Sequence, residues 1–150
     1  MKDEAFTPFY HHGQRKEGGI RTAVELWCTD PAAAKAQYGP IASWDTSEIT
    51  NMVWLFSYKA NFNGDISGWD VSSVTDMGYM LTGATSFNCD LSQWDVLNVT
   101  NMDYMLRDAT SFTHQLGGAW STSTAKKWRI FHNCPGSIAG KANDANGTPV

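Results

Sequence analysis

The chain has 150 residues, a length typical of a single domain, and its 11 Lys and Arg against 15 Asp and Glu give a formal net charge of −4. This acidic balance, with basic residues scattered along the chain, argues against a protein that binds nucleic-acid phosphates. No apolar stretch approaches the roughly 20 residues of a membrane-spanning helix, so no transmembrane segment is predicted.

The first 39 residues divide into two parts. Residues 1–18 are polar and contain several glycines, which predicts an N-terminal arm that becomes ordered only against a partner. Residues 19–39 are predicted to form a helical cap. Ile20, Ala23, Val24 and Trp27 follow helical spacing, and a second helix begins at Pro31. We expect this cap to cover the open apolar end of the segment that follows.

Residues 40–135 contain three full copies and one degenerate copy of a single pattern of about 25 residues. We use the term copies for the segments that begin at Ile41, Ile66, Leu91 and Leu116. Bulky residues recur in step in the first three copies, namely Trp44, Trp69 and Trp94, Met52, Met77 and Met102, and Phe62, Phe87 and Phe112. Such a period is typical of stacked-repeat proteins, whose like residues superpose to form a continuous core.

The predicted fold is therefore an α/β repeat, a short leucine-rich-repeat-like β-solenoid with an N-terminal helical cap. Each copy is expected to contribute a short extended segment and one inward-facing helical turn, at Met77, Met80 and Leu81 in the second copy. In the degenerate copy an extra glycine shifts the pattern, so that Trp128 and Phe131 are expected to replace Met102 and Met105 in the core. Residues 136–150 are predicted to form an irregular tail.

Specific phrases within the copies match a known pattern. Trp69-Asp70-Val71-Ser72 and Val74-Thr75-Asp76-Met77 are followed by Phe87-Asn88, and Phe62-Asn63 repeats the last pair. In these phrases the chain resembles the BspA-like leucine-rich-repeat surface proteins, whose repeat is also described as a mycoplasma-type lipoprotein domain of unknown function. The resemblance implies a non-enzymatic protein of a largely surface-exposed or secreted family, some of whose members are adhesins. It supplies no catalytic residues.

An aromatic stripe is the first candidate site. Trp54, Tyr79 and Tyr104 occupy one position of successive copies and are expected to point sideways or outward. Large amphipathic rings suit contact with a protein or a carbohydrate. The alternative is that these rings only cover the flank of neighbouring copies.

Two other residue patterns have chemical interpretations. Asp45, Asp70 and Asp95 recur in step and could hold Ca²⁺, but Asp at turns usually accepts bonds from nearby backbone N–H groups, so no metal site is predicted. Cys89 and His114 share a position in adjacent copies, and a thiol beside an imidazole can act as a nucleophile. The adjacent His11 and His12 do not face one ligand point, and no cofactor is predicted.

Together these patterns predict a non-enzymatic protein-interaction or structural subunit that binds protein partners through its flank, within a multi-subunit assembly. One alternative is a cell-surface or secreted adhesin-type module that binds protein or glycan. A remote alternative is a Cys-His hydrolase or transferase. The N-terminal sequence lacks the apolar region of a secretory signal, so the localisation is left open between an intracellular protein and a processed chain. Three cysteines, an odd number, favour free thiols over a disulfide framework.

Overall fold

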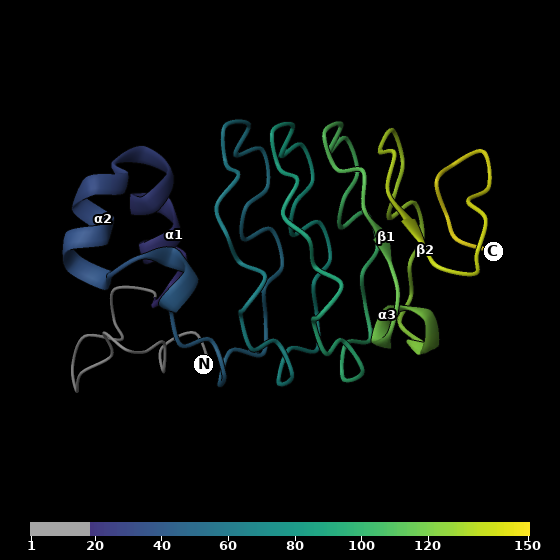
Figure 1. The fold of residues 1–150 in the computed structure, drawn as a ribbon, viewed down its shortest axis with the longest axis horizontal. Helices are drawn as coiled ribbons and strands as arrows, with labels where there is room; N and C mark the ends of the chain where they lie inside the picture. Colours follow the sequence, from purple (N-terminus) through teal and green to yellow (C-terminus); the bar gives the residue numbers. More distant parts are fainter. Residues whose placement is uncertain (1–18) are drawn as a thin grey trace.

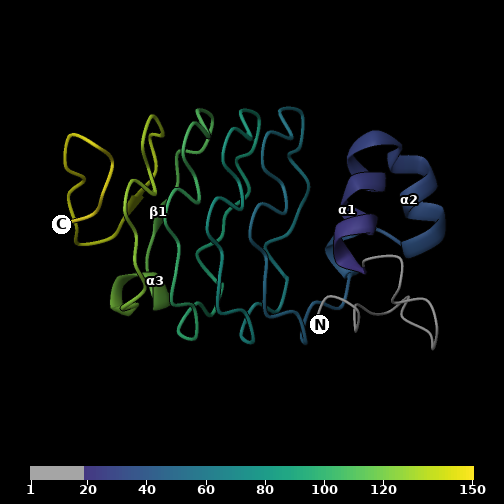
Figure 2. The same ribbon diagram turned by 180° about the vertical axis from the view of Figure 1, so that it is seen from behind.

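The computed structural model describes residues 19–150, so the predicted arm at 1–18, with His11 and His12, lies outside the described residues. Two helices stand at one end of the molecule, and the copies follow one another in a row to the other end (Figures 1 and 2). The elements in chain order are α1 (Ile20–Thr29), α2 (Pro31–Tyr38), one 3-10 turn (Ile41–Ser43), β1 (Gln115–Leu116), α3 (Ala119–Thr122) and β2 (Ser137–Ile138). None of the helices in this part of the chain is long and apolar enough to span a membrane.

The prediction of a leucine-rich-repeat-like β-solenoid is wrong. The described residues form only two strands, β1 and β2, each two residues long, which pair in parallel. Elsewhere the copies meet at isolated parallel bridges from Asn51 to Asp76, from Asp76 to Asn101 and from Asn101 to Lys126. Most of residues 44–150 is therefore turn and irregular backbone.

The backbone of each copy explains why strands are missing. In the second copy the N–H groups of Met77 and Tyr79 donate to carbonyls of the third copy, Asn101 and Asp103, at 2.9 and 3.0 Å. The N–H of Met80 lies along the same segment and instead donates back to Met77 at 3.1 Å, closing a turn. The segment thus alternates between bonds to the neighbouring copy and tight turns of its own. Neither an extended strand nor the predicted helical turn can form from this alternation.

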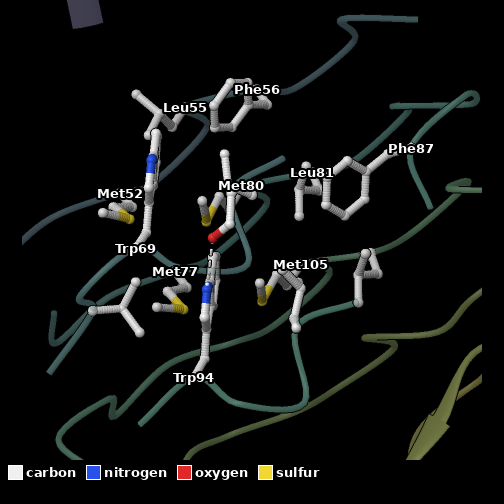
Figure 3. Close-up of a cluster of buried hydrophobic side chains, with 14 of the residues drawn as sticks. Met52, Leu55, Phe56, Trp69, Met77, Met80, Leu81, Phe87, Trp94 and Met105 are labelled. Carbon is white, nitrogen blue, oxygen red and sulfur yellow. Dashed lines mark hydrogen bonds between the residues drawn. The ribbon is translucent and has the colours of Figure 1, made fainter. Parts of the chain in front are cut away.

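The predicted core columns are confirmed. The recurring Trp, Met and Phe side chains are all buried. Figure 3 shows Trp69 and Trp94 one above the other, with Met52 beside Trp69 and Met77 beside Trp94. The indole N–H groups in this column donate hydrogen bonds to backbone carbonyls. Trp94 Nε1 donates to the carbonyl of Ile66 at 2.9 Å. Trp69 and Trp120 make the equivalent bonds to Ile41 and Leu91. Each of these three tryptophans therefore fills the core and pairs with a backbone carbonyl of the preceding copy.

Helix α1 closes the first copy. The carbonyls of Asp76 and Gly78 accept N–H groups of the copy before them, but the equivalent carbonyls of Asn51 and Val53 have no preceding copy. Arg21 of α1 supplies the missing donors: its Nη1 donates to Val53 O at 2.7 Å and its Nη2 to Asn51 O at 3.2 Å. The helix thereby satisfies acceptors that the end of a stack would otherwise leave open.

The last ten residues close the other end. The N–H of Phe131 donates to Gly147 O at 2.9 Å, and the N–H of Arg129 donates to Thr148 Oγ1 at 2.7 Å. In earlier copies the same N–H groups reach the next copy. Gly147 has φ 77°, and a Cβ built on it would lie 2.3 Å from the carbonyl carbon of Phe131. This backbone approach is therefore open only to glycine.

Candidate functional site

Four aromatic rings contact one another in a row along the stack, those of Trp54, Tyr79, Tyr104 and Trp128. A fifth exposed ring, that of Tyr58, follows Trp54 by four residues and lies over Gly83 of the second copy. We call these five residues the aromatic flank. The rings of Trp54 and Tyr79 are parallel within 12° with centroids 4.1 Å apart, and those of Tyr79 and Tyr104 are parallel within 17° at 4.7 Å. Trp128 meets Tyr104 edge to face at 5.3 Å. The three predicted residues of the stripe are thus brought together in one pile of rings.

The backbone beneath this pile is left-handed. Trp54, Tyr79 and Tyr104 have φ values of 63°, 57° and 59°, and Arg129, at the same position of the fourth copy, has 53°. For an L-residue this conformation costs roughly 1–2 kcal/mol, and glycine or asparagine normally occupies it. Backbone geometry alone therefore does not account for the large side chains at this position.

A second left-handed position in each copy provides a comparison. It is filled by Tyr58, Gly83, Asp108 and Asn133. Three of these four residues are types that tolerate positive φ, as expected where only the turn matters. Tyr58 is the exception. Its ring lies against Gly83 of the next copy. A Cβ built on that glycine would be only 2.5 Å from Tyr58 Cδ1, so the ring occupies the space that a side chain there would need.

The aromatic flank is partly open to solvent. Tyr58, Trp128 and Trp54 expose 66 %, 51 % and 45 % of their surface, while Tyr79 and Tyr104 are half-buried. Because the piled rings cover one another's faces, they present mainly their edges and, for the tyrosines, their hydroxyl ends. Exposed aromatics gathered in this way are typical of a contact surface.

Two members of the flank were missed by sequence reasoning. The prediction that Trp128 is buried in the place of Met102 is wrong, because the short helix α3 absorbs the extra residue and restores the 25-residue register. The bridge from Asn101 to Lys126 demonstrates this register. In this register Ile130 takes the buried place of Met105, Phe131 takes that of Leu106 and not, as predicted, that of Met105, and Trp128 turns outward. Tyr58 carried one signal, an aromatic residue aligned with Gly83 in the next copy.

Cys89 and His114 are not arranged as a nucleophile and its base. The Sγ of Cys89 lies 3.7 Å from Asp65 Oδ1, and burial, the largest cause, raises the pKa of this thiol. The Nε2 of His114 is 2.8 Å from the carbonyl oxygen of Asn88. A raised pKa keeps the thiol protonated at neutral pH, whereas a catalytic cysteine needs the opposite shift. This geometry gives the Cys-His alternative no support.

The recurring aspartates shape turns. Oδ1 of Asp70 accepts from the N–H of Ser72 at 3.0 Å and from its hydroxyl at 2.6 Å, and Asp45 binds Ser47 in the same way. Hydrogen bonds of this kind from Ser92 lower the pKa of Asp90. Residues 19–150 contain no group of three or more His, Cys, Asp or Glu that could hold a metal ion.

Residues 30–139, which include the whole aromatic flank, match the model of a family described as "Mycoplasma protein of unknown function, DUF285". The chain belongs to this family. The match extends from the residue after α1 to the residue after β2 and so includes residues of all four copies. No curated protein matches the chain. No solved structure matches it either.

Proposed function

We propose that this protein is a non-enzymatic interaction or structural subunit that binds a protein partner through the aromatic flank, within a larger assembly. The observation that carries the proposal is the column of Trp54, Tyr79 and Tyr104. Three bulky rings stand where the left-handed backbone favours glycine, and they remain partly exposed. A contact role explains why large side chains occupy this costly position.

The orientation of the rings favours a protein over a glycan as the ligand. A sugar stacks on an open ring face, but the faces of Tyr79 are covered by Trp54 on one side and Tyr104 on the other. Ring edges and phenol hydroxyls remain, and these suit backbone carbonyls and the aromatic side chains of a protein. Aromatic residues also dominate the energetic centres of protein interfaces.

The second candidate function is an adhesin-type module of a cell-surface or secreted protein. We infer a relationship to the BspA-like surface proteins from the Trp-Asp-Val-Ser phrase at Trp69 and its partial repeats at Trp44 and Trp94. Trp54 and Trp128, at the two ends of the row of contacting rings, are its exposed members, and a glycan would stack there. Glycan binding that is lost in both Trp54→Asn and Trp128→Ala would favour this candidate.

The test of the first candidate is capture of partners from the native source. The bait variants are wild type, a double variant Trp54→Asn/Tyr79→Asn, and a control Leu97→Ser. Asparagine tolerates the left-handed backbone, so the double variant removes the rings with little change to the fold. Leu97 is 58 % exposed and lies outside the flank.

We expect wild type and Leu97→Ser to retain the same partner protein and the double variant to lose it. Once that partner is purified, the double variant should weaken its binding by at least about tenfold, as for a central interface residue. Equal retention by all three baits would refute the proposal.

A further inference from the structure

Two arginines lie on the C-terminal half of the aromatic flank. The guanidinium carbon of Arg107 is 5.5 Å from the ring centroid of Tyr104, and that of Arg129 is 4.8 Å from the ring centroid of Trp128. Both distances are within the roughly 6 Å of a cation–π contact. The rings of Tyr104 and Trp128 are themselves in contact, and we call these two rings the C-terminal half of the flank. This half therefore carries two guanidinium groups, those of Arg107 and Arg129, beside exposed aromatic surface.

The charge of Arg129 is not neutralised within the described chain. Residues 19–150 offer it no ion pair, and its Nε atom is buried without a hydrogen-bond partner. Arg107 is only partly matched. Its Nε lies 3.3 Å from Asp108 Oδ2, an ion pair without hydrogen-bond geometry, and Asn133 already donates to the other oxygen of Asp108 at 3.0 Å.

The position of Arg129 adds a second observation. It stands where the first three copies have Trp54, Tyr79 and Tyr104, and its φ of 53° is left-handed like theirs. An arginine is strained in this backbone, as an aromatic residue is, so the turn alone does not explain its presence. What the position provides is a guanidinium placed 4.8 Å from the ring centroid of Trp128. A planar guanidinium stacked on a ring keeps its outer N–H donors aligned for a carboxylate.

We propose that the C-terminal half of the aromatic flank binds an acidic segment of the protein partner, whose Asp or Glu carboxylates pair with Arg129 and Arg107. This inference rests on the proposed function and names the chemistry of the partner. The other nearby cation, Lys126, already faces Asp103 at 3.7 Å. Two available arginines match one or two carboxylates, whereas a nucleic acid requires a longer row of cations than a chain of net charge −4 presents.

The test uses the full chain and three ligands: two synthetic peptides blocked at both ends and a short single-stranded oligonucleotide. One peptide alternates glutamate with tyrosine, and the other alternates lysine with tyrosine. Binding is measured by fluorescence anisotropy at low and at physiological salt, for wild type and three variants. Arg129→Asn removes the guanidinium and suits the left-handed backbone, and Arg107→Gln tests the second cation. Lys35→Gln on the exposed side of α2 removes the same charge away from the flank and serves as the control.

We expect the acidic peptide to bind wild type and the basic peptide not to bind. Arg129→Asn should weaken the acidic peptide about tenfold, as expected for a lost charge-assisted hydrogen bond, and Arg107→Gln by a smaller factor. Lys35→Gln should stay within about twofold, and added salt should weaken binding to wild type more than to Arg129→Asn. Unfolding curves followed by tryptophan fluorescence check that each variant is folded. If Arg129→Asn is unfolded, the loss of acidic-peptide binding in Arg107→Gln decides the test.

Three results would overturn this inference: equal binding of the two peptides, an equal loss in Lys35→Gln and Arg129→Asn, or an oligonucleotide that binds as well as the acidic peptide and depends on the same arginines. None of them would refute the flank as a binding surface, provided that Trp54→Asn/Tyr79→Asn still loses the native partner. If that double variant retains the partner, the proposed function itself is refuted.

Discussion

Replacing Tyr79 with glycine separates the cost of its left-handed backbone from the contribution of its ring contacts. Removing the Cβ at φ 57° relieves about 1–2 kcal/mol of strain, and the greater freedom of glycine in the unfolded chain costs about 0.5–1 kcal/mol. The ring also stacks on Trp54 at 4.1 Å and on Tyr104 at 4.7 Å, and losing each stack costs about 0.5–1.5 kcal/mol. We therefore expect the free energy of unfolding to fall by about 1 kcal/mol.

The assay is urea unfolding followed by the fluorescence of the buried tryptophans, such as Trp69 and Trp94. A double-mutant cycle of Trp54→Gly with Tyr79→Gly should give a coupling energy of about 0.5–1.5 kcal/mol. A loss above about 3 kcal/mol for Tyr79→Gly alone would equal the deletion of a core ring. That result would mean that the ring is structural and would remove the argument that its position serves contact. A coupling energy of zero would contradict the stacked arrangement.

Two further predictions concern the end of the stack and the turns. Gly147→Ala should lower the free energy of unfolding by about 1–3 kcal/mol beyond Gly140→Ala, because both have positive φ but only Gly147 approaches the Phe131 backbone; equal losses would contradict the close approach. Ser92→Ala should destabilise the protein at neutral pH. The hydrogen bonds from Ser92 lower the pKa of Asp90 in the folded state. The difference in the free energy of unfolding between wild type and Ser92→Ala should therefore be complete above a pH of about 4 and shrink as the pH falls through the lowered folded-state pKa. A difference that is independent of pH would show that these bonds do not favour the ionised carboxylate.

Sequence patterns were reliable where side-chain burial decides the outcome. The apolar spacing around Val24 predicted α1, the Asp30-Pro31 pair predicted α2, and both helices are present. The core columns represented by Trp69 and Met77 are buried as predicted. Burial follows from periodicity, because residues one period apart superpose in neighbouring copies and share the same environment.

The conformation of the backbone between the core residues was not predictable in the same way. Periodicity locates inward side chains, but it does not distinguish a helical turn from a series of tight turns with residues of positive φ. Tyr79 and Arg129 are residue types that rarely adopt that conformation, so residue preference indicated a different structure. For this reason the predictions of β-solenoid strands and of a helical turn at Met77 were both wrong.

The sequence alone thus determined the 25-residue period, the residues of the core and the column that holds Trp54, Tyr79 and Tyr104. Only the tertiary structure decided that these rings stack face to face, that Trp128 joins them, and that Arg129 lacks a carboxylate partner among the described residues. The physical reason is that periodicity specifies which side chains lie in one column. How their rings and charges meet depends on the φ of each turn and on the backbone N–H and C=O groups that neighbouring copies leave to be paired.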